Sequence, residues 1–308
     1  MNYLEYMIEK FPIRKKTAQK DAFLAWAQAE AEKLGYAAKV EALGEKKQHR
    51  NLVIGNPKTA QAIFTAHYDT PANMLLPNLM VPRNFPVFLL YQIFVVILLL
   101  IPAFAAMWLG AVIAPDTMLP MVLYMAVYFG LLMLLMRGPS NKHNANDNTS
   151  GVAAVLETMA RIPAEQRSKL AFILFDNEEK GLLGSKAYAK THPTVKENGF
   201  IVNLDCVGDG EHILLASSKQ AREMAAYTAL AQGMEAQSGR ELHIFPLEKC
   251  VYNSDQKSFK AGSAICACSI RKGIGFYCDK IHTNKDTVCE QANLDFIAGG
   301  LSAFVDKL

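Results

Sequence analysis

The stretch Lys169–Glu179, KLAFILFDNEE, decides the fold. Its first seven residues form a nearly continuous apolar run, which is typical of a central strand covered on both faces of a parallel sheet. Three acidic residues, Asp176, Glu178 and Glu179, come at the end of this run. Because sites in α/β sheets form at the carboxyl ends of strands, the stretch predicts a buried strand that carries carboxylates to a functional site.

Further strands and helices alternate on both sides of this stretch. The runs Gln61–Thr65 (QAIFT) and Phe200–Leu204 predict buried strands, whereas Ala22–Leu34 and Lys219–Gln237 predict helices. Strands that alternate with helices favour an α/β domain with a mostly parallel sheet. The 308 residues suffice for one such domain of roughly 250 residues and one additional element.

The composition narrows the possible partners and compartments. A formal net charge of +3, without a basic stripe that carries interleaved aromatic residues, argues against a nucleic-acid partner. None of the six cysteines forms a C-x-x-C pair, so we expect reduced and buried thiols, as in a reducing compartment. The segment Met1–Lys20 lacks the apolar core of a signal peptide, so the N-terminal part is not expected to be exported.

The additional element is a long apolar insertion. From Phe85 to Met136 the sequence contains no Lys or Arg, and its acidic residue is Asp116. Two apolar segments, about Phe85–Leu109 and about Thr117–Met136, each have the length of a membrane-spanning helix, and Gly110–Asp116 suits the turn between them. The sequence therefore predicts a transmembrane helical hairpin at residues 85–136, between a first part of the α/β domain at 1–84 and its remainder at 137–308.

The flanks of the hairpin predict its orientation. Arg83 precedes the first span and Arg137 and Lys142 follow the second, whereas the turn has no basic residue. By the positive-inside rule both flanks face the cytoplasm, so we expect an integral membrane protein with two spans and a cytoplasmic α/β domain. The notable polar side chain in the first span, Gln92, is expected to form a helix–helix hydrogen bond.

Histidines and carboxylates gather at the ends of the predicted strands or in loops near them. Taken singly, these residues have ordinary structural explanations, such as helix caps for acidic residues that precede a helix. Together they suit zinc, whose usual ligands are His nitrogen and carboxylate oxygen. The clusters are His67-Tyr68-Asp69, Asn146–Gly151, Asp176–Glu179, Asn203-Leu204-Asp205 and Ile281–Thr283 with Asp286.

These residue types fit a site for two metal ions. Asp147 would bridge the metals, His67 and Asp205 would complete the coordination of one, and Glu179 and His282 would complete that of the other. Glu178 would remain free beside a ligand, where a carboxylate can take a proton from water and pass it to a leaving amine. Asp69 would orient the imidazole of His67 through its second nitrogen.

The five motifs resemble those of the M28 family of zinc peptidases, which includes bacterial aminopeptidases and glutamate carboxypeptidases. The resemblance implies a three-layer α/β/α fold with a mixed, mainly parallel sheet, and two Zn²⁺ ions per chain. It implies the ligand roles given above and the role of general base for Glu178. The matching motifs are AHYDT (Ala66–Thr70), NDNTSGVAAVLE (Asn146–Glu157), FDNEEKGLLGS (Phe175–Ser185), NLDCVG (Asn203–Gly208) and IHTNKDT (Ile281–Thr287).

The sequence departs from the family pattern in two places. Asp69 and Asp147 are 78 positions apart (147 − 69), because the hairpin lies between them, so we expect the site close to the bilayer surface. The second departure is Asn253–Gln256 (NSDQ), where relatives often carry Ser-Asp-His, which concerns substrate contacts rather than the metal ligands.

The expected function is that of a membrane-tethered zinc exopeptidase, an aminopeptidase that releases N-terminal residues by means of metal-activated water. Its expected partners are peptide substrates, especially apolar ones, and the lipid bilayer. Two alternatives stay open: a glutaminyl-cyclase-like enzyme with a single zinc, and a non-catalytic membrane receptor or scaffold on a peptidase fold. The side-chain preference, the choice between amino- and carboxypeptidase, the oligomeric state and the native metal stay open as well.

Overall fold

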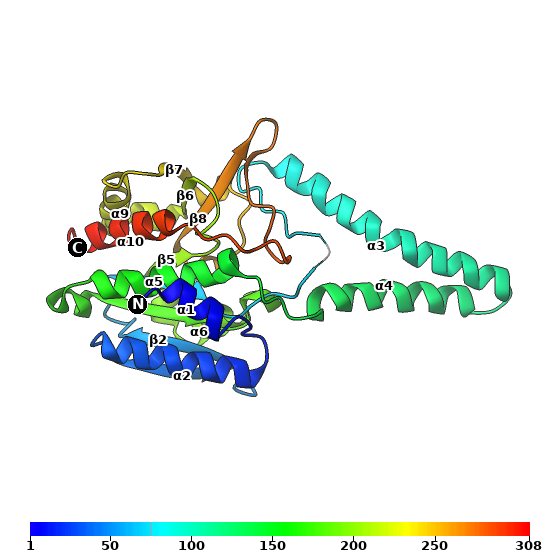
Figure 1. Cartoon of the computed structure of the whole chain (residues 1–308), viewed down its shortest axis with the longest axis horizontal. Helices are drawn as coiled ribbons and strands as arrows, with labels where there is room; N and C mark the ends of the chain where they lie inside the picture. The colour runs from blue at the N-terminus through cyan, green and yellow to red at the C-terminus, as the bar shows by residue number, and fades with distance from the viewer. Residues whose placement is uncertain (75) are drawn as a thin grey trace.

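The protein consists of an α/β body from which two long helices project together (Figure 1). The computed structural model describes residues 1–74 and 76–308, without the side chains of Met136 and Arg137. The basic flank expected at Arg137 therefore lies outside the described side chains. The other elements of the prediction can be followed in the structure.

A nine-stranded sheet forms the centre of the body. Its middle strands run parallel to one another in the order β4-β3-β5-β8, with bounds Leu170–Phe175, Ala62–His67, Phe200–Leu204 and Ala261–Arg271. Antiparallel pairing joins β2 to β4, β1 to β2 and β6 to β8, and β7 lies parallel to β6 at the edge. The bounds of the outer strands are β1 Ala38–Leu43, β2 His49–Gly55, β6 His212–Ser217, β7 Glu241–Pro246 and β9 Gly275–Tyr277.

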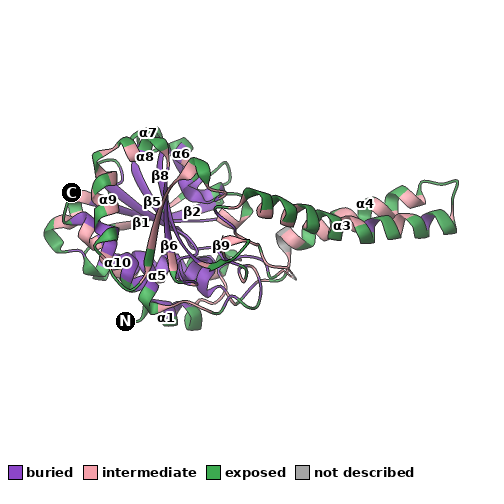
Figure 2. Ribbon diagram, turned by 90° about the horizontal axis from the view of Figure 1, so that it is seen from above, coloured by how far each residue is buried: buried purple, intermediate pink, exposed green. Residues whose placement is uncertain are grey.

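Helices cover both faces of this sheet, so the mixed, mainly parallel three-layer fold expected from the sequence is confirmed (Figure 2). Successive strand residues such as Ile63 and Phe64 point to opposite faces and enter two separate apolar cores. The larger core packs against α1 (Tyr3–Lys10), α2 (Thr17–Lys33), α5 (Gly151–Arg161), α9 (Ala225–Glu235) and α10 (Gln291–Val305). The smaller core packs against α6 (Leu183–Thr191) and α7 (Pro193–Asn198).

One predicted helix is divided. The stretch expected to form a single helix at Lys219–Gln237 is α8 (Lys219–Glu223) followed by α9, because Met224 between them has extended backbone angles. The apolar run KLAFILF forms a strand as predicted, and all six residues of β4 are buried.

The projecting helices are α3 (Phe85–Ile113) and α4 (Leu119–Arg137), which together form a helical hairpin. Helix α3 continues past the expected end at Leu109 as far as Ile113. Gly110 does not end the helix but allows α4 to pack closely against it. A Cβ atom at Gly110 would lie 2.8 Å from the Cα atom of Pro120 at the start of α4. The turn therefore begins later than predicted and the two helices meet near the tip.

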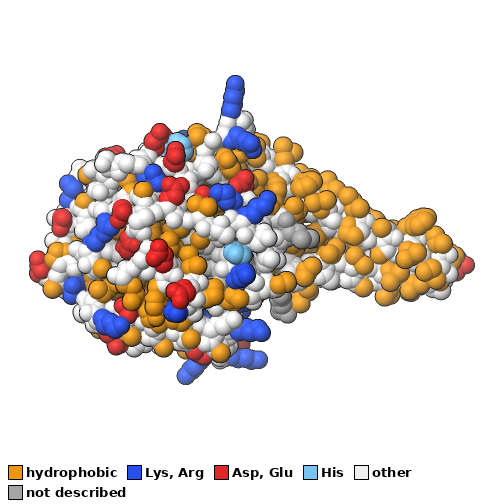
Figure 3. All heavy atoms as spheres, viewed as in Figure 1, with side chains coloured by type: hydrophobic (Ala, Val, Ile, Leu, Met, Phe, Trp, Pro, Cys, Tyr) orange, Lys and Arg blue, Asp and Glu red, His pale blue; other side chains and the backbone are white. Residues whose placement is uncertain are grey.

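The hairpin exposes an almost uniformly apolar surface, with an acidic side chain at its far end (Figure 3). Among the described residues, Phe85–Ile113 is the helix that has the length and composition of a membrane span, and Leu119–Leu135 is a shorter apolar helix. Side chains such as Leu90 and Trp108 are 66% and 69% exposed. An apolar patch of this extent on a protein surface marks a region that another apolar phase or partner covers.

Candidate metal centre

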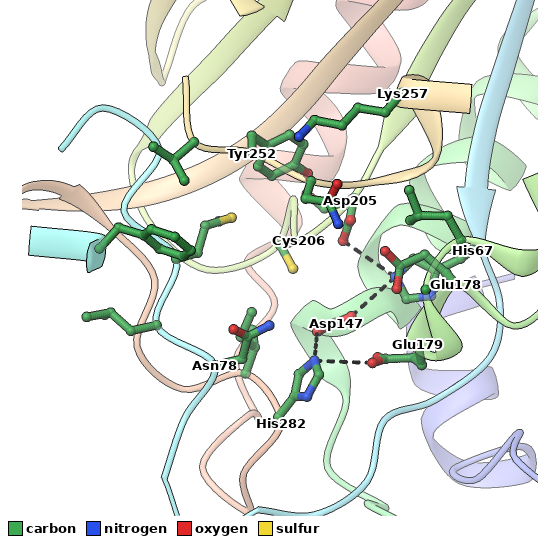
Figure 4. A pocket seen from close by; sticks show the side chains of 18 of the residues that line it. His67, Asn78, Asp147, Glu178, Glu179, Asp205, Cys206, Tyr252, Lys257 and His282 are labelled. Atoms are coloured by element: carbon green, nitrogen blue, oxygen red, sulfur yellow. Dashed lines mark hydrogen bonds and ion pairs between the residues drawn. The ribbon is translucent and has the colours of Figure 1, made fainter. Parts of the chain in front are cut away.

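The predicted site residues meet at one edge of the sheet (Figure 4). His67 is the last residue of β3, Asp205 directly follows β5, and Glu178 and Glu179 follow β4 after a two-residue turn. Because β3, β4 and β5 are parallel neighbours, their carboxyl ends lie side by side. The convergence expected from the sequence is thus produced by the strand order.

Two groups of ligands share Asp147. The Nε2 atom of His67 lies 3.3 Å from Oδ1 of Asp147 and 3.5 Å from Oδ1 of Asp205. The Nε2 atom of His282 lies 3.1 Å from Oδ2 of Asp147 and 3.3 Å from Oε2 of Glu179. The structure therefore brings together all five residues that the sequence proposes as ligands, in two clusters with one common carboxylate.

The donor atoms fit zinc. Tetrahedral ligands at 2.0–2.1 Å from Zn²⁺ lie about 3.4 Å from one another, close to the separations between these nitrogen and oxygen atoms. In the described part of the chain, the buried oxygens Oε1 of Glu179 and Oδ1 of Asp205 also have no hydrogen-bond partner. A buried carboxylate without a partner is costly, and a cation between these groups removes that cost.

Asp286 fixes the backbone that carries the shared carboxylate. Its Oδ1 accepts a hydrogen bond from the backbone N–H of Asn146 at 2.8 Å, and its Oδ2 accepts one from Asp147 at 3.0 Å. Burial and the charge of Asp147 raise the pKa of Asp286 to about 7. The sequence places Asp286 near the site without showing this contact, since the two partners are about 140 positions apart.

Asn148 joins the same loop to the end of β5. Its Nδ2 donates to the carbonyl oxygen of Leu204 at 3.0 Å, while its Oδ1 accepts from the backbone N–H of Gly151 and of Cys206 at 3.0 and 3.2 Å. Both the bridging residue and the strand that delivers Asp205 are therefore anchored to the start of α5. These hydrogen bonds explain why the second asparagine of the N-D-N-T-S-G motif, Asn148, is needed at this position.

Asp69 contacts two members of the cluster. The Nδ1 atom of His67 lies 3.2 Å from the backbone carbonyl oxygen of Asp69 and 3.6 Å from its carboxylate Oδ1. That same Oδ1 accepts a hydrogen bond from the backbone N–H of Glu178 at 3.0 Å. Asp69 thus lies beside the imidazole as expected, with its carbonyl nearer than its carboxylate, and the carboxylate additionally holds the Glu178 backbone.

Glu178 has the electrostatic surroundings of a proton carrier. Burial raises its pKa well above the usual range of glutamate, against the opposing charge of His67, and neighbouring carboxylates such as Asp205 raise it further. Groups that carry protons in active sites commonly have a pKa displaced by burial and by neighbouring charges. The side chain lines the same cavity as the proposed ligands, which is where a general base for the expected reaction would have to lie.

A buried arginine that the sequence analysis did not single out supports the site from behind. The Arg14 side chain donates to the carbonyl oxygen of Tyr68 and, through Nη2, to Oγ1 of Thr149 at 2.9 Å. Burial lowers its pKa to about 10, so it is still charged at neutral pH. Arg14 therefore ties the loop after β3 to the loop that carries Asp147, and only the folded structure shows that it is buried.

The cavity in front of the ligands has a volume of about 430 Å³. Its apolar lining includes Met80, Val251 and Ile281, and helix α3 adds Phe88 and Gln92. These last two residues are one helical turn apart and lie on the same face of α3. Gln92 therefore faces the cavity. Its surroundings do not support the helix–helix hydrogen bond expected from the sequence.

The segment Asn253–Gln256 has divided roles. Asn253 lines the cavity, whereas Gln256 is fully buried and accepts a hydrogen bond from Nδ2 of Asn203 at 3.2 Å. Asp255 is also fully buried, and neither of its oxygens has a hydrogen-bond partner within the described residues. Burial raises the pKa of Asp255 to about 7. The departure from the family pattern at Gln256 is thus a change in the packing behind the site.

Comparison with known families decides the identity of the fold. The sequence model of peptidase family M28 matches residues 129–298. This is 170 of 308 residues (298 − 129 + 1), more than half of the chain. This chain belongs to peptidase family M28. The match begins inside α4, so His67 and Asp69 lie outside it, and the roles expected for them rest on the sequence motif and on the geometry described above. No curated protein matches the sequence significantly.

Solved structures with the M28 fold include two kinds of enzyme. The Legionella pneumophila LapA aminopeptidase is 16% identical, with a TM-score of 0.57 over 99% of this chain and 69% of that one. A leucine aminopeptidase precursor from Bacteroides thetaiotaomicron is 17% identical, with a TM-score of 0.56 over 98% and 94%. The Porphyromonas gingivalis glutaminyl cyclase is 16% identical, with a TM-score of 0.59 over 99% and 96%. At such identities the likeness establishes the fold.

Proposed function

We propose that this M28 protein is an aminopeptidase that uses two zinc ions. The observation that carries the proposal is the sharing of Asp147 between two ligand clusters, one with His67 and one with His282. A carboxylate placed between two histidines in this way supports two neighbouring metals, as in a two-metal hydrolase. A cyclase with one zinc has no need of the second cluster.

The proposed chemistry assigns a task to each residue around the ligands. Bound zinc ions supply Lewis acidity, which polarises a carbonyl oxygen and lowers the pKa of water. Glu178 takes the proton of the attacking water and gives it to the departing amine. Asp69 contacts both the backbone of Glu178 and the ring of His67. These contacts fix the position of the proton acceptor relative to the metal ligand.

The cavity favours a substrate with a cationic end and an apolar side chain. Its lining includes Glu178, a carboxylate that is not among the proposed ligands and can attract the ammonium group of a free N-terminus. Its walls include Met80 and Phe88, which favour an apolar residue. Lys257 also lines the cavity and is the feature that favours the second candidate, a carboxypeptidase, because a lysine can bind a substrate carboxylate.

The deciding experiment measures metal content and peptide release on the detergent-purified full chain, with and without chelator. We expect about two zinc ions per chain and chelator-sensitive cleavage of peptides with a free amino group. Acetylation of the N-terminus should abolish cleavage, while amidation of the C-terminus should not. Cleavage that needs a free carboxylate would establish the carboxypeptidase, and pyroglutamate formation with one zinc would establish the cyclase. No metal and no activity would support the scaffold alternative.

We further propose that the hairpin of α3 and α4 crosses a membrane twice, with the α/β domain in the cytoplasm. The exposed apolar surface of both helices supports this, as do Arg83 and Lys142, which lie on the flanks, whereas the turn has no basic residue. At 1.5 Å per residue, the 29 residues of α3 measure about 44 Å, enough to cross the hydrocarbon region at a tilt.

The position of the hairpin supports apolar peptides as substrates. Helix α3 lines the main cavity through Phe88 and Gln92, and Leu135 of α4 lines a smaller cavity that also contains Asp69 and His282. Both helices therefore reach the metal centre at their body-proximal ends. A peptide that lies in or on the bilayer, such as a fragment of a membrane protein, would meet the cavity at this boundary.

Membrane topology is testable with single cysteines. The substitutions Asp116→Cys in the turn and Lys142→Cys in the flank should become labelled by a membrane-impermeant thiol reagent from opposite sides, above the background of the native thiols. Resistance of the protein to alkaline extraction should accompany this pattern. Release by alkali, or labelling of both positions from the same side, would contradict two membrane spans.

A further inference from the structure

Two histidines and a glutamate gather on the outer strands of the sheet, away from the residues that line the cavity. His212 is the first residue of β6, Glu241 is the first residue of β7, and His243 follows two positions later. The parallel register pairs His212 with Glu241. Because side chains two positions apart on a strand share a face, Glu241 and His243 project on the same side of the sheet.

The three ligand atoms are separated by distances that suit one metal ion. The Nδ1 atom of His212 lies 3.0 Å from Nε2 of His243 and 3.2 Å from Oε2 of Glu241. The third side, from Nε2 of His243 to Oε2 of Glu241, measures 3.7 Å. These values bracket the separation of about 3.4 Å between tetrahedral zinc ligands. They also span the narrower range of 3.1–3.5 Å found between ligand atoms around Asp147.

The surroundings give the cluster one closed and one open side. The ring of Phe276 in β9 lies 4.8 Å from the His243 ring and 5.7 Å from the His212 ring, so aromatic packing restrains both imidazoles. The side chain of Glu241 is 72% exposed, so solvent can complete the coordination. An aromatic wall behind the ligands and water in front are the conditions under which a three-ligand site keeps an open position.

We propose that His212, Glu241 and His243 bind a third divalent transition-metal ion, of the zinc or cobalt class, outside the catalytic centre. Two imidazoles and one carboxylate bind such ions more tightly than they bind Mg²⁺ or Ca²⁺, which prefer oxygen ligands. The ion would link β7, which lies at the edge of the sheet, to β6 through side chains as well as through backbone hydrogen bonds.

A second histidine–glutamate pair provides a matched control. The Nε2 atom of His192 lies 3.3 Å from Oε1 of Glu41, and its ring stacks on Tyr188 at 4.1 Å. No third ligand joins this pair among the described residues. It therefore has the aromatic contact and the carboxylate of the proposed site but lacks the second imidazole.

The experiment titrates the metal-free, full-length protein with Co²⁺ and follows the visible absorption of the bound ion and the number of ions retained. We expect three ions per wild-type chain, two in His243→Ala with peptidase activity unchanged, and three in His192→Ala. Because Glu241 is exposed, Glu241→Gln should fold normally and weaken the third site by at least about tenfold.

Two results would overturn the proposal. One is an equal number of bound ions, with equal affinities, in the wild type, His243→Ala and Glu241→Gln. The other is a loss of one ion in His192→Ala as well, since that would reflect a general effect of removing a surface histidine. Both readouts count ions rather than turnover, so they stand even if the proposed aminopeptidase activity is not found.

Discussion

The carboxylate of Asp286 accepts a hydrogen bond at 3.0 Å from the backbone N–H of Asp147, the residue shared by the two ligand clusters. The replacement Asp286→Asn keeps the shape but leaves one acceptor oxygen for two buried N–H groups. We expect metal affinity to fall by about 10–100-fold and the free energy of unfolding to fall by about 1–3 kcal/mol. Metal titration and denaturant unfolding measure the two effects.

The control for this change is Asp295→Asn, which removes a carboxylate that is 56% exposed and pairs with Arg161 on the surface. It should alter neither metal affinity nor unfolding by a comparable amount. An Asp286→Asn protein with wild-type metal affinity would show that the backbone of Asp147 keeps its position without this contact.

Two adjacent glutamates should respond differently to the same replacement. Glu178→Gln removes the proposed proton acceptor and should lower kcat by about 10²–10⁴-fold while metal content stays near that of the wild type. Glu179→Gln removes a proposed ligand and should lower metal content first, with activity lost as a result. Parallel measurement of kcat and bound zinc separates the two roles. Loss of metal in Glu178→Gln, or its retention in Glu179→Gln, would reverse the assignment.

The buried carboxyl of Asp255 should make the metal-free protein less stable as pH rises. Its pKa of about 7 in the fold exceeds the 3.8 of an unperturbed aspartate, because burial disfavours the charged form of the carboxyl. Between these values the folded state binds the proton that the unfolded state has lost, so the free energy of unfolding falls with rising pH. The loss from about pH 4 to about pH 7 is on the order of 4 kcal/mol at most.

Thermal unfolding of chelator-treated protein across this pH range tests the expectation. Asp255→Asn carries no charge at any pH and should reduce the decline of Tm, with the largest gain over the wild type near pH 7. Part of the decline should remain, because Asp286 and Glu178 also have raised pKa values. A wild-type Tm that rises between pH 4 and pH 7 by the same amount in both proteins would show that Asp255 does not titrate there.

Phe88 should contribute to the choice of substrate although it belongs to α3. Phe88→Ala should raise KM for substrates with a large apolar residue by about tenfold, the equivalent of about 1.4 kcal/mol of lost apolar contact, with little change in kcat. Phe94→Ala, on the same helix but 49% exposed and not among the cavity residues, is the control. Equal KM values for the two variants would remove the hairpin from the substrate pocket.

The sequence was sufficient to predict the strands that position the proposed metal centre. A run such as KLAFILF can be buried on both faces only in the middle of a sheet, and polar residues that follow such runs must collect at one edge. His67, Glu179 and Asp205 follow or end strands β3, β4 and β5, so simple topology brings them together. The resemblance to the family motifs supported the same prediction, and the strand order explains why these residues meet.

Residues whose roles depend on distant partners could not be predicted in this way. Arg14 begins a short basic run, Arg14-Lys15-Lys16, yet it is fully buried, and its donors are satisfied by Tyr68 and Thr149. Gln92 lies in an apolar helix, and only the placement of α3 against the body shows that it faces the cavity. The break at Met224 depends on backbone angles within a sequence that otherwise favours a helix.

The chain distributes the metal centre over almost its whole length. His67 precedes the hairpin and Asp147 follows it, whereas His282 comes 215 positions after His67 (282 − 67). During synthesis the ribosome therefore releases the last ligand long after the first. The cluster of His67, Asp147 and Asp205 needs both parts of the body, whereas the cluster of Asp147, Glu179 and His282 waits for the end of the chain. The proposed metal centre can therefore assemble in full only after nearly the whole chain has been made.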